Sequence, residues 1–339
     1  MASNPATATR SVDLVVIGGG AGGLSAARAA ARHGASVLLV QRGPVGGDCT
    51  FSGCVPSKTL IEAAHRGESF EEAMTAVRRT VEVVAATEND QVLAREGVEV
   101  LHGWAELRSP DVVDVDGTRI RAPRVVIATG ARPAVPPIDG LADTDYLAGE
   151  TIWDLDTLPS SLAVLGGGAI GCELAQAFAR LGSNVTIVEG ADRLLPHEEP
   201  EASAVISEAL AADGATVHTG ATVTRVGARD RKGAVQLHLD AGGTVDADRL
   251  VLAAGRTPAI DGLGLDAAGI AADRGAIRTD DTLATTARGV WAVGDVTGRL
   301  QFTHAADEMG RTAVANAFSR LHRRRFRTDA IPWVTFTDP

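Results

Sequence analysis

Cysteine is scarce in this chain of 339 residues, which contains only three. Three cysteines are too few for the disulfide framework of a small secreted protein. In a reducing compartment, two cysteines that lie close together more often serve catalysis or metal binding than structure. The scarcity excludes a disulfide-stapled scaffold and draws attention to where the few thiols stand.

Long apolar runs and an excess of positive charge are also missing. No apolar run approaches the roughly 20 residues that a membrane helix needs, and the polar N-terminus has no hydrophobic signal core. The net charge is −11, and the basic run at 320–327 is local and typical of a solvated helix end. We therefore expect no membrane or nucleic-acid partner, a cytoplasmic location and a disordered tail over 1–11.

A repeat dominates what is present. The segment 14–41 aligns without gaps onto 162–189, so that three glycines of the first copy fall on three of the second. Each copy has a short apolar strand, a glycine turn, an Ala-rich helix and a second apolar strand. This pattern predicts two βαβ units, each opened by a G-x-G-x-x-G turn. The glycines are Gly18, Gly20 and Gly23 in the first copy and Gly166, Gly168 and Gly171 in the second.

The glycine spacing has a specific physical meaning. The first glycine makes the tight turn, the second lets the backbone approach a pyrophosphate, and the third lets helix and strand pack closely. The helix N-terminus then offers N–H groups and a positive dipole end to the phosphates. One such turn can be only a turn, but two complete copies predict two dinucleotide sites.

The residue after the second strand of each copy differs. A carboxylate there usually accepts hydrogen bonds from ribose hydroxyls. The second copy has Glu189, which favours NAD over NADP because a 2′-phosphate would meet a negative charge, although Arg193 nearby weakens that preference. The first copy has Gln41, an uncharged amide that leaves open whether binding there is looser.

Two of the three cysteines stand in the segment GGDCTFSGCVPSK at 46–58. Cys49 and Cys54 come just before Pro56, which suits the first turn of a helix because its missing N–H costs nothing there. A helix N-terminus lowers a thiol pKa, and the thiolate is the reactive species. A structural pair is a weaker alternative, and a zinc site is weaker still because C-x4-C is not usual zinc spacing.

Two dinucleotide turns with a cysteine pair, followed by a strand that ends in Gly294 and Asp295, resemble the class I pyridine nucleotide–disulfide oxidoreductases over about 12–339. That family includes dihydrolipoamide dehydrogenase, mercuric reductase and glutathione reductase. The resemblance implies an α/β fold with two Rossmann-like, doubly wound nucleotide-binding domains. An FAD domain at 12–150 and 271–330 is interrupted by an NAD(P) domain at 151–270. The linker at 149–161 separates the two.

The resemblance also implies roles for single residues. Cys49 and Cys54 match the redox disulfide, with Cys54 against the flavin and Cys49 exchanging with substrate. Lys58 matches the lysine beside the reactive flavin nitrogen, and Glu173 matches its ion-pair partner. Asp295 matches the residue that holds the ribityl chain, and His304 is expected to supply packing or backbone contacts. The cofactor-binding residues implied in all are Gly18, Gly20, Gly22, Gly23, Gln41, Arg42, Gly47, Lys58, Thr129, Gly130, Gly166, Gly168, Ala169, Ile170, Gly171, Glu189, Gly255, Arg256, Gly294, Asp295, Thr303 and His304.

The resemblance stops at the end of the chain. The segment 331–339 matches the first strand of the family's C-terminal dimerisation domain, and the rest of that domain, with its acid–base His–Glu pair, has no counterpart. We expect a monomer or weak association. The alternatives are an enzyme whose flavin half-reaction survives, a nucleotide-binding remnant with only NADH–dye or oxidase activity, and an NADH-dependent flavoenzyme that never uses its cysteines.

The expected cofactors are FAD and NAD(H), in preference to NADP(H), and the expected partner is a small or protein-bound thiol or disulfide. Because Glu189 favours NAD, dihydrolipoamide dehydrogenase-like chemistry is the first choice of reaction. A mercuric reductase-like reaction is the alternative. Glutathione reductase is disfavoured because those enzymes prefer a positive NADP pocket.

Overall fold

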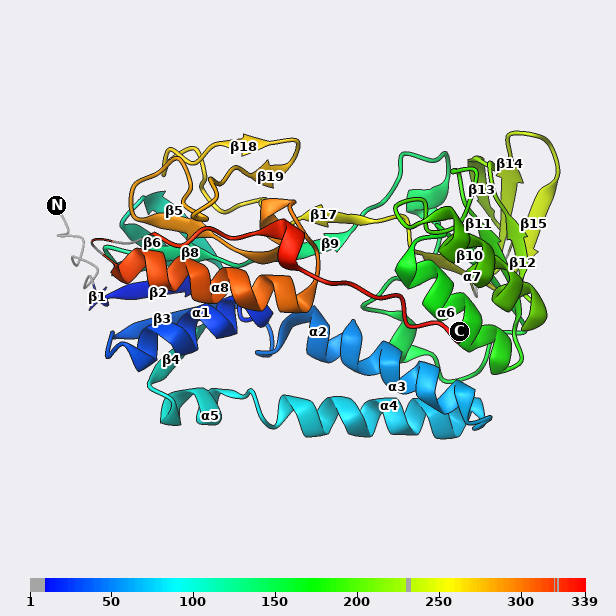
Figure 1. Cartoon of the computed structure of the whole chain (residues 1–339), viewed down its shortest axis with the longest axis horizontal. Coiled ribbons are helices and arrows are strands. Elements are labelled where there is room, and N and C mark those ends of the chain that lie inside the picture. Colours follow the sequence, from blue (N-terminus) through cyan, green and yellow to red (C-terminus); the bar gives the residue numbers. More distant parts are fainter. Residues whose placement is uncertain (1–9, 230–232, 320, 322) are drawn as a thin grey trace, which may run out of the picture. The chain divides into compact units, whose positions relative to one another are not determined.

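The computed structural model describes residues 10–229, 233–319, 321 and 323–339, and the chain divides into two compact units (Figure 1). Unit 1 comprises Met1–Cys49, Ala85–Arg132 and Thr257–Trp333. Unit 2 comprises Thr50–Val84, Pro133–Arg256 and Val334–Pro339. The main part of unit 2 is therefore inserted in sequence between segments of unit 1. The predicted domain boundaries at 150 and 270 stay predictions.

A five-stranded parallel sheet forms the centre of unit 1, in the order β20-β8-β2-β3-β4. Its strands are β2 (Leu14–Ile17), β3 (Val37–Gln41), β4 (Val98–His102), β8 (Val125–Ile127) and β20 (Val290–Ala292). Helices α1 (Ala21–Arg32) and α8 (Thr303–Phe318) pack against each other, as Figure 1 shows. The short helix α5 (Asp90–Arg95) precedes β4.

Alternation along β2 explains why this strand lies at the centre of the sheet. Val15 and Ile17 face one apolar cluster and Leu14 and Val16 face another, and all four are buried. Side chains of a strand alternate between the two faces, so a run of four apolar residues suits a sheet that is covered on both sides. The apolar run read from the sequence thus becomes an interior parallel strand.

Unit 1 also carries a four-stranded sheet in the order β1-β7-β6-β5. Its members are β1 (Arg10–Ser11), β5 (Ala105–Ser109), β6 (Val112–Val115) and β7 (Thr118–Arg121). The other short elements are β18 (Ala272–Asp273), β19 (Ala276–Ile277) and the 3-10 turns η3 (Gly294–Thr297) and η4 (Thr328–Ala330). The predicted disordered tail over 1–11 extends two residues too far, because Arg10 and Ser11 form β1, which pairs with β7. Residues 1–9 of that tail lie outside the described residues.

Unit 2 repeats the parallel arrangement. Its four-stranded sheet has the order β12-β11-β10-β16 and its antiparallel sheet the order β13-β14-β15. The strands are β10 (Ser161–Leu165), β11 (Asn184–Val188), β12 (Thr216–His218), β13 (Val223–Ala228), β14 (Val235–Leu239), β15 (Thr244–Ala247) and β16 (Arg249–Leu252). The helices that follow β10 and β11 are α6 (Ala169–Arg180) and α7 (Pro200–Ala212), and the 3-10 turns are η1 (Leu141–Asp143) and η2 (Ile152–Asp154). The predicted α/β fold with two Rossmann-like sheets is confirmed.

Three helices follow β3 in the chain and precede α5 and β4. They are α2 (Gly47–Phe51), α3 (Cys54–His65) and α4 (Phe70–Ala85). In unit 2, α3 packs against α6, and both contribute to one apolar cluster with Leu60 and Phe178. The chain passes from one unit to the other at β9 (Ala131–Pro133) and again at β17 (Arg256–Pro258).

The last nine residues differ from the expectation. No strand forms within 331–339, all of which the structure describes. Residues 334–339 instead make side-chain and backbone contacts with helices of unit 2, which satisfy the groups that a neighbouring strand would otherwise bind. Among the described residues, no helix combines the length and the apolar character needed to cross a bilayer.

Candidate active site

The first glycine turn joins β2 to α1, and the three glycines of its motif differ in the space that they leave for a Cβ. Gly18 has φ +105°, and a Cβ there would lie 2.3 Å from the Ala128 carbonyl oxygen. A Cβ on Gly23 would lie 1.8 Å from the Gly18 oxygen. At Gly20 the nearest atom, the Gly47 Cα, would be 3.9 Å away. The turn is thus packed on the protein side and open where a ligand would approach.

The second turn, between β10 and α6, repeats this geometry. A Cβ on Gly166 (φ +113°) would lie 2.4 Å from the Ala253 oxygen, and one on Gly171 would lie 2.0 Å from the Gly166 oxygen. At Gly168 nothing lies within 4 Å. The adjacent Ile170, in the first turn of α6, is 48% exposed.

Neither helix that follows a turn has a side-chain cap at its start. The N-cap residues are Gly20 for α1 and Gly168 for α6, and no side chain accepts a hydrogen bond from the first-turn N–H groups. A helix leaves its first N–H groups without intrahelical partners, and these groups bind phosphate well. Both sites therefore fit the pyrophosphate of a dinucleotide.

The residue at each strand end holds its own turn. The Gly19 N–H donates to Gln41 Oε1 at 2.8 Å, and Gln41 Nε2 donates to the Pro44 carbonyl at 3.1 Å. In unit 2, Glu189 Oε2 accepts from the Gly167 N–H at 2.6 Å, and its Oε1 accepts from Ala191 at 2.7 Å. Gly19 and Gly167 were not singled out from the sequence, although their equivalent places in the two copies were a usable signal.

Two arginines follow the strand ends. The Arg42 guanidinium lies 5.2 Å from the ring centre of Trp104. Arg193 donates to the carbonyls of Glu198 at 2.7 Å and Pro196 at 2.9 Å, so its guanidinium is engaged within its own loop.

The remaining predicted cofactor residues lie in both units. In unit 1, a Cβ on Gly22 would lie only 3.2 Å from the Ala306 oxygen, and Gly47 packs on Gly20. The Thr129 hydroxyl donates to the Ala259 carbonyl at 2.8 Å. Two further glycines have positive φ angles and lie a few residues after β8 and β16. These are Gly130 and Gly255, with Arg256 following as the first residue of β17. Gly294 and Asp295 open η3.

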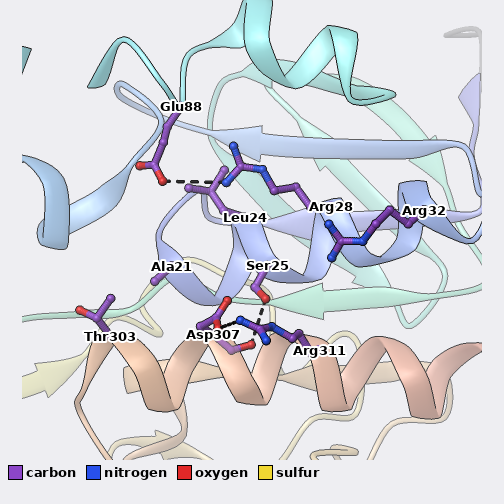
Figure 2. A pocket seen from close by; sticks show the side chains of 9 residues that line it. All are labelled: Ala21, Leu24, Ser25, Arg28, Arg32, Glu88, Thr303, Asp307 and Arg311. Atoms are coloured by element: carbon purple, nitrogen blue, oxygen red, sulfur yellow. Dashed lines mark hydrogen bonds and ion pairs between the residues drawn. The ribbon is translucent and has the colours of Figure 1, made fainter. Parts of the chain in front are cut away.

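Thr303 and His304 begin α8. His304 Nε2 lies 2.6 Å from the Pro332 carbonyl oxygen, and its ring stacks on Phe302, which stacks on Trp333. Thr303 also lines a surface pocket of about 530 Å³ along α1 and α8 (Figure 2). In that pocket Arg28 pairs with Glu88 at 3.9 Å, and Arg311 pairs with Asp307.

The cysteines lie in two consecutive helices, α2 and α3. Cys49 is half-buried in α2, and Cys54 is exposed as the first residue of α3. The turn between these helices is held in unit 2, where Trp153 Nε1 donates to the Ser52 carbonyl at 3.1 Å and the Ser57 hydroxyl donates to Gly53 at 2.7 Å. Among the described residues, no group of three or more His, Cys, Asp or Glu side chains could hold a metal ion.

The predicted Lys58–Glu173 pair is present in unit 2. Lys58 Nζ lies 2.6 Å from Glu173 Oε2, and the Glu173 side chain is only 7% exposed. The pair joins α3, which begins at Cys54, to α6, which begins at the second glycine turn. Glu173 Oε1 accepts a second hydrogen bond, from the N–H of Phe336 at 2.9 Å, and nothing in the sequence motifs pointed to that contact.

The third cysteine has a different environment. Cys172 is fully buried in α6, and its Sγ lies 3.4 Å from the Gly167 carbonyl oxygen. Burial, together with the nearby charges of Glu173 and Glu189, raises the pKa of the Cys172 thiol to about 12. This thiol stays protonated at neutral pH, so Cys172 contributes to core packing and is not a reactive cysteine.

The model of the pyridine nucleotide-disulphide oxidoreductase family matches residues 12–310. The chain belongs to this family. Its members are FAD-dependent oxidoreductases that use a pyridine nucleotide and act on thiol or disulfide substrates. The family resemblance expected from the two glycine turns and the cysteine pair is thus confirmed.

Individual relatives carry different names. The chain is 35% identical to a mercuric reductase of Bacillus cereus, covering 96% of this chain and 55% of that one. It is 36% identical to a dihydrolipoyl dehydrogenase of Chlorobaculum tepidum, covering 89% of this chain and 69% of that one. The structure of a HOCl-induced flavoprotein disulfide reductase, RclA from Escherichia coli, in a Cu(II) complex, superposes with a TM-score of 0.87 at 33% identity, covering 93% of this chain and 73% of that one. The chain thus spans little more than half of the first relative.

Proposed function

We propose that this chain is an NADH:disulfide oxidoreductase in which unit 1 binds FAD, unit 2 binds NADH, and Cys49 and Cys54 form the redox disulfide. The ion pair between Lys58 and Glu173 carries the proposal, because it links the helix that begins at Cys54 to the helix of the second glycine turn at 2.6 Å. When bound, FAD would supply the two-electron chemistry between nicotinamide and disulfide.

The two glycine turns would hold the two pyrophosphates. Gly20 and Gly168 leave the approach open, and the uncapped starts of α1 and α6 supply N–H donors and a positive dipole end. Gln41, Asp295 and Thr129 would bind the FAD side.

NAD is the proposed nicotinamide cofactor. The Glu189 carboxylate would accept hydrogen bonds from the adenosine ribose and repel a 2′-phosphate. Arg193 is engaged by the carbonyls of Pro196 and Glu198, so it offers a 2′-phosphate less than its position in the sequence suggests.

Lys58 is the proposed catalytic cation. Its ammonium, held by the buried Glu173 carboxylate, would place a positive charge beside the reactive part of the cofactor. The disulfide takes up two electrons and two protons and yields the two thiols of Cys49 and Cys54. A Cys49 thiolate would then attack a sulfur of the substrate disulfide, which forms a mixed disulfide and releases the first substrate thiol. Attack by Cys54 releases the second and restores the pair.

A lipoamide-type disulfide is the first candidate substrate, because the NAD preference suggests it. Hg(II) is the second candidate, because the Bacillus cereus relative is named a mercuric reductase. Two adjacent thiolates, such as those of Cys49 and Cys54, would bind this soft metal ion. We place the reaction in the cytoplasm, which the sparse cysteine usage favours.

Thiol counting tests the proposal. The purified protein is incubated anaerobically with or without NADH, quenched in acid, alkylated after unfolding and analysed by mass spectrometry. NADH should add alkyl groups at Cys49 and Cys54, while Cys172 is alkylated in both samples and serves as the internal standard. A protein whose two cysteines are equally labelled with and without NADH would overturn the proposal.

The same reduced protein separates the substrates. Lipoamide should restore the oxidised state of both cysteines and consume NADH in step with lipoamide, whereas Hg(II) should consume NADH and leave the cysteines reduced. Turnover of neither would leave the NADH half-reaction as the activity and remove both substrate assignments.

A further inference from the structure

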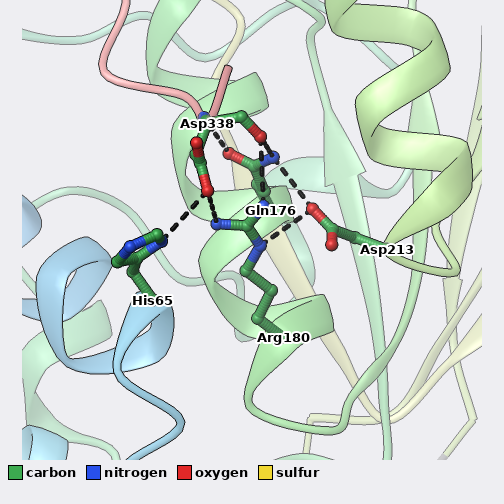
Figure 3. A network of polar contacts seen from close by, with 5 residues as sticks. All are labelled: His65, Gln176, Arg180, Asp213 and Asp338. Atoms are coloured by element: carbon green, nitrogen blue, oxygen red, sulfur yellow. Dashed lines mark hydrogen bonds and ion pairs between the residues drawn. The ribbon is translucent and has the colours of Figure 1, made fainter.

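The end of the chain is held on unit 2 at two points, the first of which is Asp338. Its N–H donates to Gln176 Oε1 at 2.9 Å, and Gln176 Nε2 donates to its carbonyl at 2.8 Å (Figure 3). Gln176 is only 3% exposed, so its amide acts as a fixed partner for the backbone, as a neighbouring strand would. We call residues 334–339 the terminal strap.

Charged side chains reinforce this anchor. Arg180 lies 3.0 Å from Asp338 Oδ2 and 2.9 Å from Asp213 Oδ2, and His65 Nδ1 lies 3.0 Å from the same Asp338 oxygen. In Figure 3 His65 from α3 and Arg180 from α6 converge on Asp338, while Asp213, just after α7, contacts Arg180 from the other side. The Arg180 guanidinium, followed by His65, holds the pKa of the Asp338 carboxyl below its usual value.

The second point is Phe336, and it lies on the proposed catalytic pair. The Phe336 N–H donates to Glu173 Oε1 at 2.9 Å, while Lys58 occupies Oε2. The Phe336 ring centre lies 4.5 Å from Lys58 Nζ, within the range of a cation–π contact. Lys58 Nζ also donates to the Ser57 hydroxyl at 3.4 Å.

These contacts divide the two oxygens of a buried carboxylate between two partners. A buried charge is costly unless each of its acceptor sites is satisfied. Because the strap satisfies Oε1, the orientation of Glu173, and with it the direction in which Oε2 holds Lys58, depends on Phe336. The Phe336 ring also packs against the Lys58 ammonium, which restricts its position further.

We propose that Phe336 is a positioning residue for Lys58, and that the terminal strap is the element that holds it there. This inference rests on the proposed function, in which Lys58 acts on the nicotinamide half-reaction. Phe336 contacts Lys58 through its ring and Glu173 through its N–H, so we infer that it acts through these two residues and not on the dinucleotide.

The first test replaces the ring. Phe336→Ala and Phe336→Leu should slow the anaerobic bleaching of the flavin by NADH roughly fivefold, because a cation–π contact of about this strength is lost. Phe336→Tyr keeps an aromatic face and should recover the rate to within about twofold. The dissociation constant of NADH should stay unchanged in all three. Val334→Ala, in the same strap and 61% exposed, is the matched control.

A second test removes the backbone donor. Phe336→Pro deletes both the ring and the N–H that Glu173 accepts, and should slow bleaching about tenfold or more. Val334→Pro introduces the same restriction at a position whose N–H has no partner among the described residues. Equal losses in both proline variants would show a general effect of the strap and overturn the role of Phe336.

A double-mutant cycle separates this inference from the proposed function. If Lys58→Ala slows bleaching and Phe336→Ala adds nothing in that background, the two residues act as one unit. Full additivity of the two changes, with each rate loss intact, would refute positioning through Lys58. If Lys58→Ala leaves the rate unchanged, the proposed role of Lys58 fails and the inference about Phe336 fails with it.

Discussion

The glycine turns of the two units have the same backbone and different charges at the strand end. In both, a glycine N–H donates to the side chain at the end of the second strand, Gln41 in unit 1 and Glu189 in unit 2. The amide accepts one hydrogen bond and donates another, to Pro44. The carboxylate accepts two, the second from Ala191.

This difference teaches that the strand-end position has two separable roles. Holding the turn requires only a side-chain oxygen that accepts a hydrogen bond from the glycine N–H, and both Gln41 and Glu189 supply one. A negative charge is an addition that only unit 2 makes, at the place where the family's pyridine nucleotide is expected. On the function proposed above, selection between NADH and NADPH would depend on this charge, while the hydrogen bond that holds the turn is present in both units.

The largest effect is expected from comparing alanine substitutions at two glycines of the unit 2 turn, Gly171 and Gly168. Gly171→Ala puts a Cβ 2.0 Å from the Gly166 oxygen, so α6 must move away from β10. We expect a loss of about 3 kcal/mol of unfolding free energy. Gly168→Ala meets nothing within 4 Å and should change stability by less than about 0.5 kcal/mol.

Gly168→Ala should instead weaken NADH binding at least about tenfold, since its methyl group stands where the pyrophosphate approaches. Urea unfolding and NADH titration of both variants check the pair. An unstable Gly168→Ala variant, or one with normal NADH affinity, would contradict the assignment of the open face. Gly20→Ala is the matched change in unit 1 and should leave NADH affinity as it is.

The repeat allowed much of this to be predicted from the sequence. Ungapped copies with three equivalent glycines predict two turns, because a turn without space for Cβ accepts only glycine. The pairing of Lys58 with Glu173 was predicted from the family motif alone. The link from Gln41 to Gly19 was not, because it depends on the path of the loop between strand and turn.

The contacts of the strap were the least predictable. Phe336 and Lys58 are distant in sequence, and no periodicity or motif connects them. An exposed apolar segment can pack on many surfaces, and only the fold of α3 and α6 brings Glu173 Oε1 to the Phe336 N–H. The family resemblance predicted a strand in the same segment, yet its backbone binds the Gln176 side chain and no strand partner.

A second difference between the turns concerns the residue after the third glycine. Unit 1 has Leu24 there and unit 2 has Cys172, and both are buried. Because the Cys172 pKa is raised from 9.0 to about 12, its contribution to stability is full below pH 9 and is lost as the pH rises toward 12. The slope should reach about 1.4 kcal/mol per pH unit at most.

Cys172→Ala isolates this slope. Urea unfolding of both proteins at about pH 8 and about pH 10.5 should show a steeper loss in the natural chain, since the titrations of Lys and Tyr are common to the two. Parallel losses would mean that the folded thiol ionises as readily as the unfolded one. The variant also tests whether the thiol, like Leu24, is needed only for packing.

The smallest effect is expected from exchanging the side chains at the strand ends, Glu189 in unit 2 and Gln41 in unit 1. Glu189→Gln gives unit 2 the amide of unit 1 and keeps an oxygen for the Gly167 N–H. Removing the charge should reduce the preference for NADH over NADPH roughly tenfold, about 1.4 kcal/mol, with little change in stability. The ratio of kcat/KM for the two nucleotides in dye reduction measures this.

The reciprocal change, Gln41→Glu, is the matched control. It removes the donor to Pro44 and sets a carboxylate against that carbonyl, so unit 1 should lose about 1 kcal/mol of stability. The nucleotide preference should not move, because the charge is added in the other unit. A preference that shifts in Gln41→Glu and stays fixed in Glu189→Gln would reverse the assignment of the two units to their cofactors, whereas a shift in neither would place the selection outside the strand ends.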